Sequence, residues 1–110
     1  MHPLIENNIQ SISDICQLNH VEELYIFGSI TGSHFSEESD IDFLVSFTID
    51  EQDLETYTES YFNILFALEE LFVREIDLLT ELSIKNPLFK AEIDTSKQLV
   101  FTSLVRADSY

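Results

Sequence analysis

Two aspartates two positions apart, Asp40 and Asp42, are the residues of this chain best suited to chemistry. They lead into the apolar, β-prone segment 43–47. Because side chains alternate along a strand, both carboxylates point the same way, with Cα atoms roughly 7 Å apart. Two like charges on one face cost free energy unless a cation lies between them, and hard divalent metals prefer oxygen ligands. The pair therefore predicts a metal site with positions left open for phosphate.

A third carboxylate, Asp77, lies within a further predicted strand, 74–80, whose other residues are largely apolar. An ionised carboxylate rarely occupies so buried a strand without a partner or a metal. If this strand lies beside the one that follows the first pair, Asp77 completes a three-carboxylate cluster with Asp40 and Asp42. The alternative is that Asp77 caps a turn at the strand end. We favour the cluster, in which two divalent ions could share the ligands, as in nucleotidyl transfer.

A small-residue turn, Gly28-Ser29, follows the predicted strand 22–27, and ten residues separate it from Asp40. Glycine lets the backbone approach a phosphate closely, and N–H groups at a helix start point at anions. The Ser29 hydroxyl adds one donor. His34 in the spacer could face a phosphate or a base, but a solvated loop position is the simpler interpretation.

Hydrophobic periodicity predicts the elements that position these residues. Strands are predicted at 22–27, 41–47, 74–80 and 97–102, and helices at 3–18, at 51–72 with Asp50 as N-cap, and from Asn86-Pro87 to about Ile93. Strands separated by helical stretches imply an α/β (α+β) class, with helices packed on a small mixed β-sheet. At 110 residues, the chain is expected to form a single domain over 1–110.

The charge balance limits the partners. The chain carries 21 acidic and 5 basic residues, a net charge of −16. This negative charge argues against direct binding to nucleic acid or to anionic membranes. It would attract a basic protein partner and speed their encounter, or it serves solubility alone. No apolar run approaches ~18 residues, so no membrane span is expected. The single Cys16 excludes an internal disulfide, and with no signal-peptide pattern at 1–8 a cytoplasmic protein is expected.

The Gly28-Ser29 turn, the ten-residue spacer, the segment 39–45 and the late segment 76–79 resemble the nucleotidyltransferases of the DNA polymerase beta superfamily. Over roughly residues 22–101 they look most like the minimal nucleotidyltransferases (MNT). The resemblance implies a polymerase-beta-like nucleotidyltransferase fold. It implies that the catalytic residues Asp40 and Asp42 are shared metal ligands. It implies that Asp77 is the third metal ligand and activates the acceptor hydroxyl, and that Gly28 and Ser29 bind the triphosphate of the nucleotide.

Many MNT proteins are antitoxins encoded beside HEPN-domain ribonuclease toxins, and they transfer AMP from ATP to a tyrosine of the toxin. The resemblance therefore implies a Mg²⁺-dependent protein adenylyltransferase with two ions, ATP as substrate and a basic HEPN partner, with which it could form an oligomer. Many relatives carry Arg after Gly-Ser, whereas this chain has Ile30 and Thr31. Metal ions and backbone N–H groups would have to offset most of the phosphate charge.

Two other functions compete with AMP transfer. In the first, the chain is a non-catalytic acidic antitoxin that neutralises a basic HEPN toxin by stoichiometric binding, in line with its charge and the amphipathic stretch 51–72. Such a stretch more often packs on the protein's own sheet. In the second, the acceptor is a small molecule. We rank this last because nothing in the sequence marks a small-molecule pocket.

Overall fold

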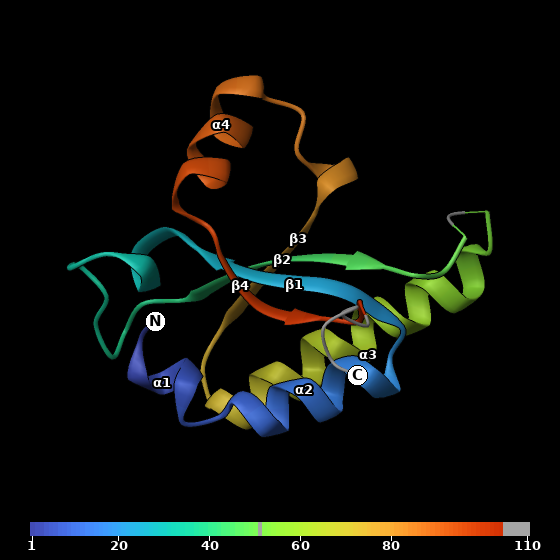
Figure 1. Ribbon diagram of the computed structural model, residues 1–110, viewed down its shortest axis with the longest axis horizontal. Coiled ribbons are helices and arrows are strands. Elements are labelled where there is room, and N and C mark those ends of the chain that lie inside the picture. The colour runs from blue at the N-terminus through green and yellow to red at the C-terminus, as the bar shows by residue number, and fades with distance from the viewer. Residues whose placement is uncertain (51, 105–110) are drawn as a thin grey trace.

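A mixed four-stranded sheet is the centre of the computed structural model, which describes residues 1–50 and 52–104 (Figure 1). Its strands are β1 (Val21–Phe27), β2 (Ile41–Phe47), β3 (Ile76–Thr80) and β4 (Gln98–Thr102), in the order β3-β2-β1-β4. Strand β1 is antiparallel to β2 and β4, whereas β2 and β3 are parallel. The predicted class, a small mixed sheet with helices packed on it, is confirmed.

Helices cover both faces of this sheet. Helices α1 (Pro3–Glu6), α2 (Ile9–Leu18) and α3 (Leu54–Phe72) lie on one face, and α4 (Pro87–Ser96) lies over the other (Figure 1). The larger core lies on the three-helix side, and its fully buried members include Ile12, Cys16, Leu24, Ile26, Phe43, Ile64 and Leu68. A smaller core under α4 joins Phe27, Leu44 and Ile93. Because both faces are covered, β1 and β2 are apolar on both sides and carry few polar positions.

The helix α3 connects the two parallel strands, since a parallel pair requires a crossover rather than a hairpin. Its inner face buries Ile64, Leu68 and Phe72, so the amphipathic stretch packs largely on the protein's own sheet. Leu54, an apolar residue within the predicted amphipathic stretch 51–72, is 69% exposed at the start of the helix. Among the described residues, none of the helices combines the length and apolar character required to cross a bilayer.

Three predicted boundaries are wrong for local reasons. The single helix expected over 3–18 is interrupted, because Asn7 ends α1 and the Asn8 amide donates back to the Leu4 carbonyl (2.8 Å). Helix α3 begins at Leu54 with Asp53 as its N-cap, which accepts from the Thr56 N–H (3.3 Å). Asp50, the predicted cap, instead accepts from the Gln52 N–H (2.9 Å) and forms a separate turn.

The third strand is shorter than predicted. It begins at Ile76 rather than at residue 74, and a short 3₁₀ segment, η2 (Glu81–Ser83), follows it. A second such segment, η1 (Gly28–Thr31), follows β1 where a short helical start was expected. The predicted last strand and last helix are present within one to three residues of their expected ends.

Candidate active site

Asp42 and Asp77 are direct neighbours across the parallel strands β2 and β3. Each of the two aspartates has buried apolar neighbours on both sides in its strand, and these neighbours point into the larger core. Because side chains alternate along a strand, the two carboxylates are directed to the opposite face, under α4. The adjacency required for a carboxylate cluster, that the third strand lie beside the second, is therefore observed. Asp77 is exposed, whereas Asp42 is half-buried.

Asp40 lies immediately before β2 and is exposed. It is nevertheless near enough to act on Asp42. Burial first, and then the negative charges of Asp77 and Asp40, raise the pKa of Asp42 from 3.8 to about 6. The structure thus brings all three predicted carboxylates into electrostatic contact around Asp42.

The backbone of Gly28 closes tightly on this group. Gly28 has a φ of +74°, a left-handed conformation that disfavours side chains. A Cβ atom at this position would collide with Oδ2 of Asp42 and lie 3.4 Å from its Cγ. Only glycine therefore permits both the turn and the approach of the Asp42 carboxylate.

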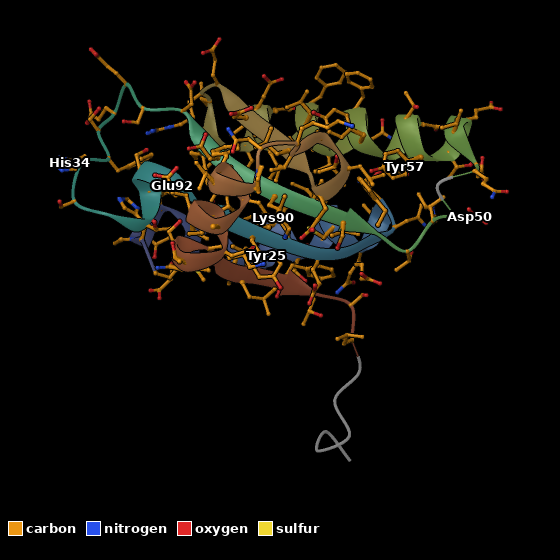
Figure 2. All side chains as sticks on the ribbon, turned by 90° about the horizontal axis from the view of Figure 1, so that it is seen from above. Tyr25, His34, Asp50, Tyr57, Lys90 and Glu92 are labelled. Carbon is orange, nitrogen blue, oxygen red and sulfur yellow. The ribbon has the colours of Figure 1, made fainter. Side chains whose placement is uncertain are left out.

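The residues after Gly28 follow from the same turn. Ser29 is partly exposed, as a phosphate contact requires, and the Thr31 hydroxyl donates to the Gly28 carbonyl (2.7 Å). Ile30 is 2% exposed and belongs to the larger core. An Arg side chain at position 30 would lose this burial, which explains why the turn carries no charge there. His34 is exposed in the loop that follows (Figure 2).

A hollow of about 510 Å³ lies beside the carboxylates. Its lining is Phe27, Gly28, Asp42, Asp77, Phe89, Glu92, Ile93, Thr95 and Ser96. Five of these, on α4, were missed by sequence reasoning, which predicted the helix but not the face it covers. The apolar pair Phe89 and Ile93, four residues apart, was the available signal, because it marks a helix face directed at the sheet. Phe89 lies edge-on against Phe27, with ring centroids 6.4 Å apart.

Arg74 is a second missed residue, and it positions the loop that ends at Asp40. Its Nη1 donates to the carbonyl oxygens of Ser36 (3.1 Å) and Ser39 (2.8 Å). Its guanidinium also lies over the Phe35 ring, 4.8 Å from the centroid. These contacts hold the chain immediately before Asp40 without placing Arg74 in the hollow.

Carboxylate oxygens facing a solvent-filled hollow are a suitable donor set for a hard divalent cation, which completes its coordination from water and phosphate. Within residues 1–50 and 52–104, no three His, Cys, Asp or Glu side chains converge closely enough to enclose a metal ion. Mutual repulsion explains this spread, since Asp42 already experiences both neighbouring charges. The residues fit a site in which the protein supplies only part of the coordination.

Comparison with known proteins identifies the class. Residues 10–104 match the family model described as polymerase beta, nucleotidyltransferase. A Methanocaldococcus jannaschii protein described as a candidate protein adenylyltransferase is 36% identical to this chain over 74 residues, which cover 67% of this chain and 71% of the relative. This chain therefore belongs to the polymerase beta nucleotidyltransferase family, a family of enzymes, as its residues indicated.

Solved structures agree on the fold. A candidate minimal nucleotidyltransferase superimposes with a TM-score of 0.64 at 20% identity, over 86% of this chain and 90% of that one. The MNT antitoxin complex with the tri-AMPylated HEPN toxin of Shewanella oneidensis gives 0.60 at 16% identity, over 90% and 73%. A toxin–antitoxin structure with AMP-PNP gives 0.64 at 17% identity, over 87% and 74%. The fold is thus that of the minimal nucleotidyltransferases.

Replacing Gly28 by Ala should destabilise the protein by roughly 1–2 kcal/mol from the left-handed backbone alone, with a further loss from the collision with Asp42. Urea unfolding measures this. Gly32→Ala is the matched control, because a Cβ there meets only the Ser29 carbonyl oxygen at 3.8 Å. In an Asp42→Ala background the Gly28→Ala penalty should shrink. Equal losses at both glycines would contradict the close packing.

The raised pKa of Asp42 predicts a pH-dependent stability. Because the folded-state pKa of about 6 exceeds the ordinary value of 3.8, the metal-free protein loses stability from this group as pH rises from about 4 through 6. Asp42→Asn should therefore unfold at a higher temperature than wild type at pH 7.5, and at a similar temperature at pH 4. Solvent screening of a half-buried group limits the gain to roughly 1 kcal/mol, or about 4–8 °C. Thermal melts without metal at both pH values measure it, and a constant difference would refute the assignment.

Proposed function

We propose that this protein transfers AMP from ATP to a tyrosine hydroxyl of a partner HEPN-domain ribonuclease in the cytoplasm, and so acts as its antitoxin. The observation that carries this proposal is the pairing of Asp42 with Asp77 across adjacent strands, against the Gly28 turn. Carboxylates that can hold divalent cations, together with an open backbone turn at the same hollow, suit the phosphates of a metal-bound nucleotide.

The chain's residues divide the reaction between them. The turn at Gly28 and Ser29 orients the triphosphate, and Asp77, the more exposed of the paired carboxylates, accepts the proton from the tyrosine hydroxyl. The phenolic oxygen then forms a bond to the α-phosphorus, and the bond from that phosphorus to the bridging oxygen breaks. Pyrophosphate leaves, and AMP remains on the tyrosine.

Two Mg²⁺ ions would be held by Asp40, Asp42 and Asp77, and the two ions would share these ligands. Bound Mg²⁺ would neutralise phosphate charge and lower the pKa of the acceptor hydroxyl. The need for it is acute in this chain, because Ile30 is buried and, among the residues that the structure describes, no Lys or Arg lines the hollow.

The nature of the partner is inferred from charge and from relatives. A net charge of −16 favours a basic protein partner. The Methanocaldococcus jannaschii relative is named for adenylyl transfer to protein, and a structure of like fold is an MNT antitoxin in complex with a tri-AMPylated HEPN toxin. These support a HEPN protein as acceptor and ATP as donor.

The decisive experiment measures dose. With ATP and Mg²⁺, a small amount of this protein should silence an excess of a HEPN ribonuclease partner and add about one AMP mass per modified tyrosine, seen by mass spectrometry. Asp42→Asn should reduce the rate of AMP transfer by a factor on the order of 10³ or more, because it removes a carboxylate that both metal ions would share in the transition state. Equal protection by Asp42→Asn at low dose would rule out catalysis.

A second experiment tests the metal without activity. Adding Mg²⁺ or Mn²⁺ at pH 7.5 should raise the melting temperature of the wild-type protein, because a cation relieves the repulsion among the carboxylates. The rise should be much smaller for the double change Asp40→Asn, Asp42→Asn. The double change Glu37→Gln, Glu38→Gln removes two exposed acids just before the site and should leave the rise intact. Equal rises in all three proteins would exclude a metal site at these aspartates.

Stoichiometric neutralisation is the alternative function. The observation that favours it is the uncharged turn, in which Ile30 is buried where relatives place Arg. A binding antitoxin would require equal amounts of the two proteins, would need no ATP, and would keep its effect in Asp42→Asn. The dose experiment therefore separates the two functions.

A further inference from the structure

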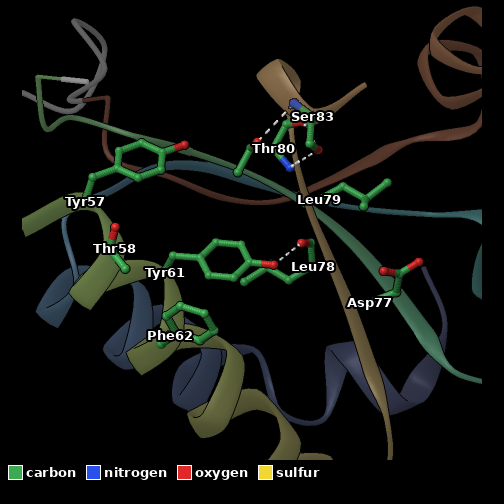
Figure 3. A pocket seen from close by; sticks show the side chains of 9 residues that line it. All are labelled: Tyr57, Thr58, Tyr61, Phe62, Asp77, Leu78, Leu79, Thr80 and Ser83. Atoms are coloured by element: carbon green, nitrogen blue, oxygen red, sulfur yellow. Dashed lines mark hydrogen bonds between the residues drawn. The ribbon is translucent and has the colours of Figure 1, made fainter. Parts of the chain in front are cut away.

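A second hollow, of about 440 Å³, meets the first at Asp77. It runs between α3 and β3 and is lined by Tyr57, Thr58, Tyr61, Phe62, Asp77, Leu78, Leu79, Thr80 and Ser83 (Figure 3). We name it the α3/β3 groove. Resting on the nucleotidyltransferase function proposed above, we propose that this groove binds the tyrosine-bearing segment of the acceptor protein and leads the tyrosine hydroxyl to Asp77.

The first support for this assignment is that the two hollows meet at one residue, Asp77. The larger hollow contains Gly28 and both paired aspartates and suits the nucleotide. The α3/β3 groove contains neither Gly28 nor Asp42, but it ends at Asp77, the residue assigned to the acceptor proton. An acceptor entering from this side would approach the α-phosphorus without displacing the nucleotide.

Aromatic side chains form one wall of the groove and continue beyond it on α3. Tyr61 and Phe62 meet edge to face with ring centroids 5.2 Å apart, and Phe62 stacks on Phe66 at 5.8 Å. Phe62 and Phe66 remain 45% and 59% exposed. Exposed stacked rings on a helix suit the burial of another aromatic ring, such as that of a tyrosine.

Hydrogen bonds along β3 decide how the segment enters. The Tyr61 hydroxyl donates to the Leu78 carbonyl (2.6 Å), and the Ser83 hydroxyl accepts from the Thr80 N–H (3.2 Å) and donates to the Thr80 carbonyl (2.7 Å) (Figure 3). The Leu78 and Thr80 carbonyls and the Thr80 N–H are therefore already paired, which disfavours addition of a further strand at these two residues. We expect the segment to bind mainly through side chains that enter the groove.

Charge selects a basic acceptor over a second copy of this chain. Within residues 1–50 and 52–104, Asp77 is the only charged residue in the lining, and the exposed acids Glu55 and Glu59 flank the groove on α3. Two copies would each carry a net charge of −16 and would repel. A tyrosine flanked by lysine or arginine would place its ring against Phe62 and its cations near Glu55 and Glu59.

The test uses the full chain, a HEPN-domain partner protein and ATP labelled at the α-phosphate. Thr58→Arg fills the groove from an exposed position of α3. Asn63→Arg adds the same charge to an exposed position of α3 outside the lining and is the matched control. Phe62→Ala removes part of the aromatic wall. Melting curves establish that each variant is folded.

We expect Thr58→Arg and Phe62→Ala to raise the KM for the HEPN protein tenfold or more, with the KM for ATP unchanged, while Asn63→Arg behaves as wild type. An unchanged KM in Thr58→Arg, or an equal rise in Asn63→Arg, would overturn the groove assignment. Absence of label with the wild-type protein would instead contradict the proposed function. In that case calorimetric titration with the HEPN protein decides the groove, since equal affinities of wild type and Thr58→Arg would overturn it and a tenfold weaker binding of Thr58→Arg alone would support it.

Discussion

The half-buried carboxylate of Asp42 is the constraint on which the site depends. It lies beside Asp77 on a parallel strand and against the backbone of Gly28, so neighbouring charge and loss of solvent both disfavour its ionised form. A folded protein retains such a group at a cost in stability, and functional sites are where such costs are commonly found. A cation bound among the carboxylates would relieve this cost and would link the stability of the fold to ligand binding.

The sheet makes this arrangement possible by serving two cores at once. Its larger core, with α1, α2 and α3, provides most of the buried apolar surface, and Ile41, Phe43 and Val45 anchor β2 there. The opposite face can then carry Asp42 and Asp77 under α4 with only the small cluster of Phe27, Leu44 and Ile93. Rigid strands, rather than loops, thus hold both paired aspartates, whereas Asp40 depends on a loop that Arg74 ties down.

The position of α4 on the site's face would also separate the approaches that we propose for the nucleotide and the acceptor. The hollow under α4 and the α3/β3 groove have only Asp77 in common. A small nucleotidyltransferase domain that modifies a macromolecule benefits from such a division, because the nucleotide and the acceptor need not compete for one entrance. The acidic and aromatic residues along α3 (Glu55, Glu59, Phe62 and Phe66) would then select the acceptor, and the Gly28 turn and the aspartates would bind the phosphates of the nucleotide.

The sequence by itself determined the strands, the class of fold and the family that the match over residues 10–104 bears out, because alternation and turn chemistry are local properties. It placed helix ends poorly at Asn7 and Asp50, where side-chain hydrogen bonds over two to four residues compete with the helix. Only the tertiary structure decided that Asp77 pairs with Asp42, that Ile30 is core, and that Phe89 and Arg74 serve the site. Strand order and helix placement depend on contacts between distant segments, which no local pattern encodes.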